Sequence, residues 1–129
     1  MSRITIIFSC LAGIIHAVFF LLESVFWHKP QVHSIFRIDN TADAETLSVF
    51  VQNQGYYNLF LALGLFAAVW LSRKNKVASR TLAIYICLFM IGAAVVLRFT
   101  MPAMTAGPLI QGVAPAIALL SIYLSLRNE

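Results

Sequence analysis

Ionisable and amide side chains lie near the ends of long apolar segments in this chain, and their types could bind a ligand or exchange protons. Glu23 directly follows the first apolar run, and His16 lies inside that run, two helical turns before Glu23. A histidine and a glutamate at this spacing could form a titratable pair for acid and base chemistry. The other candidates for a ligand-binding or buried polar cluster are Trp27, Asn53, Gln54, Tyr57, Asn58, Arg98 and Gln111.

Helical periodicity predicts that these candidates face the same interior. At about 100° per residue, positions three, four and seven apart share one side of a helix. The resulting stripes are His16, Phe20, Glu23 and Trp27; Asn53, Tyr57, Gly64 and Ala68; Cys87, Ile91, Ala94 and Arg98; and Gln111, Ala114 and Ala118. We predict one inward-facing polar cluster near one membrane surface, with Glu23 and Arg98 as its charge pair.

A purely structural role for the same residues stays open. A charged group inside a bilayer costs roughly 2.5 to 3.5 kcal/mol on insertion scales, so each one needs a partner or a purpose. Arg98 could instead extend toward the headgroups. The amides could simply join helices through hydrogen bonds of roughly 0.6 to 2 kcal/mol each.

The elements that must position these residues are four long runs without formally charged side chains. The runs are Ile4 to Leu22, Thr46 to Ser72, Thr81 to Leu97 and Phe99 to Leu126. Each is about long enough to cross roughly 30 Å of hydrocarbon at about 1.5 Å per residue. They predict transmembrane helices over about 4–26, 43–71, 81–99 and 109–126.

Composition supports a membrane fold. Hydrophobic residues make up 60% of the chain and charged residues 11%, and the mean hydropathy is +0.85, whereas soluble domains carry about 25% charged residues. We therefore predict an all-α integral membrane four-helix bundle forming a single transmembrane domain over residues 1–129. Between the first two helices we expect a polar loop, after which Thr41 or Asp43 caps the second helix.

Lysine and arginine in the flanking segments predict the orientation. Six of them share one side of a four-crossing topology, namely Arg3, Arg73, Lys74, Lys76, Arg80 and Arg127, against Lys29 and Arg37 on the other side. Because positively charged loops stay cytoplasmic, both termini are predicted inside. The net charge of +4 then reflects topology and contact with anionic lipid headgroups, and no nucleic-acid partner is expected.

No motif predicts a metal site, a cofactor or a set of catalytic residues. His28 and His33 are five residues apart, a spacing that matches no strong metal site. Cys10 and Cys87 are expected to pack as small apolar groups, since a disulfide at their depth would face the reducing side of the membrane. We therefore expect no metal, no cofactor and no catalytic constellation.

Three stretches resemble a known family. The segments "IHAVFFLLESVFW" from Ile15, "NQGYYNLFLALGL" from Asn53 and "QGVAPAIALL" from Gln111 are similar to the bacterial membrane proteins grouped as domain of unknown function 1304. The resemblance covers nearly the whole chain and implies four helices, a multi-pass location in the bacterial cytoplasmic (inner) membrane, and a common site. It implies no activity.

Three functions remain open at this stage. The first hypothesis is a non-enzymatic small membrane protein that forms a homo-oligomer and binds or helps move a small or amphipathic ligand at an outer-leaflet polar pocket. The second is a membrane-embedded acid/base enzyme, an isomerase or reductase, in which His16 and Glu23 exchange protons with a lipid-like substrate. The third is a proton-coupled small-molecule exporter, although Glu23 lies too near one membrane surface for a midplane site.

Overall fold

The structure, a computed structural model, describes residues 1–128 and is helical or irregular throughout them. In chain order the helices are α1 (Arg3–Phe20), the π-helical turn η1 (Leu21–Val25), α2 (Pro30–Ile35), α3 (Thr41–Leu71), α4 (Lys76–Thr100) and α5 (Ala106–Arg127). Four of them, counting α1 with η1, are long and apolar enough to span a membrane. The predicted all-α bundle of four long apolar helices is confirmed.

Two helices begin earlier than the apolar runs suggested, because asparagines cap them. Asn75 accepts a hydrogen bond from the backbone N–H of Ala78 at 3.0 Å, so α4 starts five residues before the expected Thr81. Asn40 caps α3 in the same way by accepting from Asp43 at 2.7 Å. The prediction of Thr41 or Asp43 as the cap was wrong, since a cap must precede the first helical residue.

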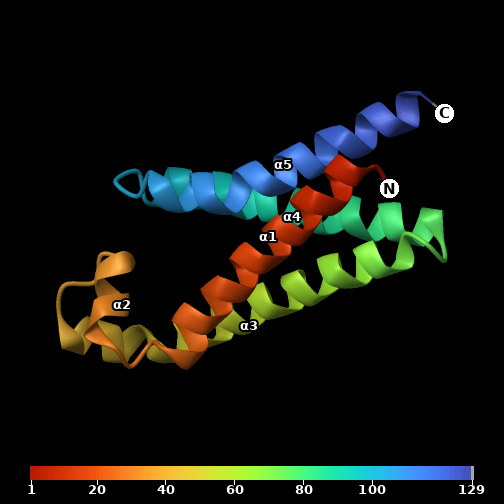
Figure 1. The fold of residues 1–129 in the computed structure, drawn as a ribbon. Helices are drawn as coiled ribbons and strands as arrows, with labels where there is room; N and C mark the ends of the chain where they lie inside the picture. The colour runs from red at the N-terminus through yellow and green to blue at the C-terminus, as the bar shows by residue number, and fades with distance from the viewer. Residues whose placement is uncertain (129) are drawn as a thin grey trace.

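Each of the four long helices contacts two others, so that they form a ring. The two halves of this ring separate toward one end of the bundle. α1 packs on α3 and α5, and α4 packs on the same two helices. Figure 1 shows both termini at one end, which we call the terminal end. Toward the opposite end, the loop end, the pair α1 and α3 (the first arm) diverges from the pair α4 and α5 (the second arm). Residues near the loop end therefore belong to one arm or the other.

Small side chains close the bundle in its terminal half. Ala12, Ala68, Ala83 and Ala118 are fully buried there beside larger core residues such as Leu65. Small residues let helix backbones approach closely, which is how helices associate where lipid tails remove the usual hydrophobic driving force. This half of the molecule is held by close packing.

The loop end carries a small cap that the sequence did not predict. The segment expected to be a loop contains α2, which starts at Pro30, a residue favoured in the first helical turn. Trp27, Val32 and Ala44 form its buried core. The cap fastens the chain between α1 and α3 onto the first turns of α3.

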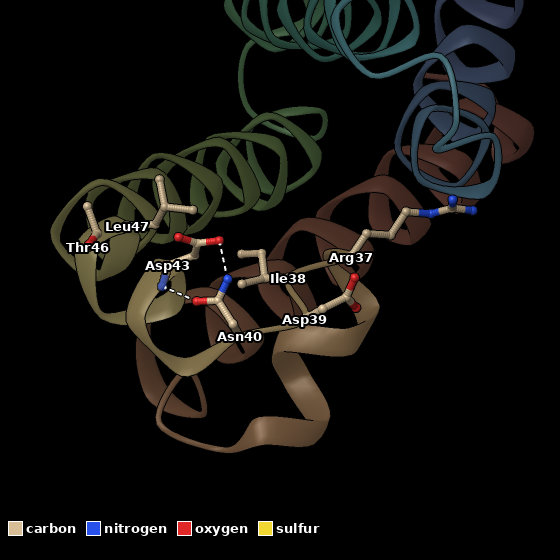
Figure 2. A pocket seen from close by; sticks show the side chains of 7 residues that line it. All are labelled: Arg37, Ile38, Asp39, Asn40, Asp43, Thr46 and Leu47. Carbon is tan, nitrogen blue, oxygen red and sulfur yellow. Dashed lines mark hydrogen bonds between the residues drawn. The ribbon is translucent and has the colours of Figure 1, made fainter.

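Figure 2 shows a shallow pocket of about 380 Å³ beside this cap, where the chain enters α3. Arg37 lies there with a left-handed backbone (φ 58°). The Asn40 amide donates to the Asp43 carboxylate at 2.5 Å while its oxygen caps the helix. Asn40 and Asp43, both at this pocket, thus serve the start of α3.

Candidate functional site

Glu23 lies in the π-helical turn that ends the first transmembrane segment. The backbone N–H of Phe26 donates to the carbonyl of Leu21 at 2.8 Å, five residues back, which widens the last turn of the helix. Single π turns of this kind are rare and occur frequently at functional sites. The turn shifts the angular position of everything that follows it, so Glu23 and Trp27 do not continue one ideal α-helical stripe.

The Glu23 carboxyl is buried against α3. Its side chain is 7% exposed, and the Asn58 amide, 6% exposed, donates to its oxygen at 2.7 Å. The two residues are 35 positions apart, so this bond fixes η1 to α3. We call these two residues the Glu23–Asn58 pair.

Gly55 makes the approach of η1 to α3 possible. A Cβ atom placed on Gly55 would lie 2.1 Å from Ser24 Oγ and 3.0 Å from Glu23 Cβ, closer than real Cβ contacts allow. The Ser24 hydroxyl donates to the carbonyl of Gln52 at 2.9 Å, one turn earlier on α3. Backbone contact through a glycine therefore positions the carboxyl, in addition to its bond with Asn58.

His16 is buried on the same helix but is directed to a different partner. Its Nδ1 lies 2.9 Å from the carbonyl oxygen of Ala12, and its ring meets Phe19 edge-on at 5.9 Å between centroids. Within residues 1–128 the Glu23 carboxyl is bonded to Asn58 and the His16 ring to its own helix. The two residues do not form a direct hydrogen-bonded couple.

Trp27 is buried in the cap. Its indole N–H donates to the carbonyl of Ala44 at 3.1 Å, and its ring packs on His33 with centroids 4.8 Å apart. The His33 ring also donates through Nε2 to the carbonyl of Trp27 at 2.6 Å. Trp27 and His33 thus hold the cap together one turn beyond Glu23.

Three candidates on α3 do not face the bundle interior. Asn53, Gln54 and Tyr57 are all exposed, which contradicts the predicted inward cluster. Further along the same stripe Gly64 does meet Ile86 of α4, where a Cβ would come within 2.4 Å of its side chain. The stripe faces α4 only where the arms are together, and at the loop end α4 has moved away.

Arg98 and Gln111 lie on the second arm and are also incompletely covered. Arg98 is exposed and its guanidinium donates to the carbonyl of Pro102 at 3.3 Å, while Gln111 is half-buried. The predicted charge pair between Glu23 and Arg98 was wrong, because the two residues belong to arms that diverge at this level. Each residue bonds within its own arm.

The Glu23 carboxylate can accept more hydrogen bonds than the one that Asn58 donates to it. A carboxylate offers about four acceptor positions, and the described part of the chain fills one of them. Neither Glu23 oxygen is a fully buried atom without a hydrogen-bond partner in residues 1–128. Ionisable groups inside membrane spans are functional by default. The arrangement suits a group that donates hydrogen bonds to Glu23.

Cysteines and metal-ligating residues add nothing to this site. Cys10 and Cys87 are free thiols, with Cys87 packed in the core of the terminal half. In residues 1–128 no three His, Cys, Asp or Glu side chains come together as a metal site.

The chain belongs to the family described as protein of unknown function DUF1304, whose model matches residues 10–123. The match confirms the resemblance seen in the sequence. Neither the curated proteins nor the solved structures that were compared with the chain give a match.

Proposed function

We propose that this DUF1304 protein binds an amphipathic ligand at the loop end of its first arm, with Glu23 as the anchoring group. The observation that carries the proposal is the Glu23 carboxyl, buried on a π-helical turn with one hydrogen bond, from Asn58. A structural carboxyl would gain little from a turn that departs from regular helix. A ligand-binding carboxyl benefits, because the turn fixes its direction.

The chemistry of the site selects the ligand class. Glu23 accepts hydrogen bonds, and the apolar helix surfaces beside it suit a hydrocarbon tail. A head group that donates hydrogen bonds, with a primary amine as the strongest case, complements a carboxylate. The ligand we propose is therefore an amphiphile with a donor head and an apolar tail.

The proposal also includes the membrane orientation of the chain and the depth of Glu23. Both termini lie at one end of the bundle, and α1 runs from that end toward the other, where η1 with Glu23 follows it. The six-to-two distribution of Lys and Arg supports cytoplasmic termini in a bacterial inner membrane. Glu23 then lies in the outer leaflet, where an amphiphile can enter sideways from the lipid.

A direct test measures thermal unfolding of the full chain in detergent with a long-chain primary amine, and with the alcohol of equal chain length for comparison. A ligand at one hundred times its Kd stabilises the folded state by about 2.7 kcal/mol. We expect the amine to raise the Tm of the wild type and to lose that effect in Glu23→Gln, which keeps the size of the side chain but weakens the acceptor.

Glu45→Gln is the matched control, since Glu45 is an exposed carboxyl in the first turns of α3. It should respond to the amine as the wild type does. Equal responses of Glu23→Gln and Glu45→Gln, or no response of the wild type to either amphiphile, would contradict the proposal. Chemical conversion of an added lipid-like substrate would instead favour the acid/base enzyme.

A further inference from the structure

An apolar groove runs along the surface between α4 and α5, on the arm that does not carry Glu23. It measures about 510 Å³, and its lining includes Ile84, Ile91, Leu119, Leu120, Tyr123 and Leu126. Pockets for small molecules typically measure roughly 300 to 1,000 Å³. The lining side chains are hydrocarbon apart from the Tyr123 hydroxyl, which suits an acyl chain.

An arginine stands at the terminal end of this groove. Leu120, Tyr123 and Arg127 follow one another at three- and four-residue intervals, so they share one side of α5. This helix therefore carries Arg127 at the end of the groove nearest the termini.

We propose that the groove holds an anionic phospholipid, with an acyl chain against the apolar lining and the phosphate at Arg127. Arginine binds phosphate with two parallel hydrogen bonds, which a hydrated ammonium does not match. Tyr123, which is 60% exposed, lies one turn from Arg127, and tyrosine rings favour the level of the lipid headgroups. The site is separate from the Glu23–Asn58 pair and takes a ligand of opposite charge.

Charge complementarity favours this occupant over a second copy of the chain. In a symmetric dimer with both copies in the same membrane orientation, Arg127 would approach its own counterpart at the same depth. Like charges side by side oppose such contact. An anionic lipid bound in the groove neutralises Arg127, and one arginine beside an anionic headgroup attracts it by an amount equivalent to about fivefold in affinity.

The test is native mass spectrometry of the full chain in detergent micelles, with phosphatidylglycerol and phosphatidylcholine of the same acyl chains added in equal amounts. Wild type should retain phosphatidylglycerol at least about fivefold better. Leu120→Trp fills the groove and should lower retention about tenfold, since an acyl chain loses its buried methylene groups. Leu124→Trp is the control, because Leu124 is exposed on the same helix but lies outside the lining residues.

A second pair of variants tests the headgroup. Arg127→Gln should lower the preference for phosphatidylglycerol by about fivefold, whereas Arg3→Gln, which removes an exposed arginine of α1 at the same end, should leave it unchanged. Equal retention of the two lipids by wild type, or equal effects of the two tryptophan variants, would overturn the proposal. So would dimers that only Leu120→Trp dissociates without loss of lipid, because the groove would then bind a second copy.

Discussion

The two ends of the bundle differ in how their polar side chains are hydrogen-bonded. At the terminal end the hydroxyls of Ser2, Thr5 and Ser121 bond to one another at 2.8 to 2.9 Å. At the loop end the Glu23–Asn58 pair leaves acceptor positions of a carboxylate unfilled. Short hydroxyls therefore join helices in the closed half, apart from Ser9, whose buried hydroxyl has no hydrogen-bond partner in residues 1–128. The buried carboxyl lies on the arm that diverges.

This difference separates the part of the molecule that holds the bundle together from the part that carries the candidate site. Packing of small residues is sensitive to added volume. The Glu23 carboxyl is instead sensitive to loss of its charge when the size of the side chain is kept. Substitutions matched for size can therefore test each half independently.

The largest effect is expected from Ala68→Leu in the terminal half. Ala68 is fully buried and its carbonyl accepts from the Ser79 hydroxyl at 2.7 Å, so α3 and α4 are in direct contact there. Added methylene groups in a filled core cost about 1 to 3 kcal/mol. Ala67→Leu, at the exposed neighbouring position, should stay within about 0.5 kcal/mol.

Unfolding in detergent monitored by circular dichroism measures both variants. Similar losses for Ala67→Leu and Ala68→Leu would mean that the terminal half is not closely packed. The comparison between the two ends would then lose its structural basis.

A second matched set concerns two glycines in helices. Gly55→Ala should destabilise the protein by about 1 to 3 kcal/mol, because its new methyl group meets Ser24 and Glu23. Gly92 has nothing within 4 Å of its Cβ position, so Gly92→Ala should be neutral or stabilising by up to about 1 kcal/mol. Thermal unfolding of both variants decides whether η1 truly contacts α3.

The sequence predicted the long helices well and the site only in part. Runs without charged residues determine where a chain can cross a bilayer, so the four spans follow from the positions and lengths of these runs. Helical periodicity also correctly predicted that Gly64 and Ala118 face the bundle interior. Both predictions depend on local properties of the chain.

The remaining errors concern relations between helices. Periodicity assumes that a stripe faces the same neighbour along its whole length, and the diverging arms break that assumption at Asn53 and Arg98. The π turn at Glu23 lies against α3 at Gly55, and nothing in the sequence of the turn itself marks it. A glycine next to tyrosines in an apolar helix was the available sign of such close contact.

Smaller effects should follow from the buried hydroxyls of the terminal half. Thr5→Val removes two bonds, to Ser2 and Ser121, and should cost about 0.6 to 2 kcal/mol. The Ser9 hydroxyl, buried without a hydrogen-bond partner in residues 1–128, offers a contrast. Ser9→Ala should be neutral or stabilising, because an unsatisfied buried group is removed.

The most direct test of the contrast between the arms is a pair of double-mutant cycles on Glu23, measured by unfolding in detergent. One cycle combines Glu23→Gln with Asn58→Leu, and the other combines Glu23→Gln with Arg98→Gln. We expect a coupling of at least about 0.5 kcal/mol between Glu23 and Asn58, and additivity within about 0.5 kcal/mol for Glu23 and Arg98. Strong coupling to Arg98 with none to Asn58 would contradict the diverging arms and the site built on them.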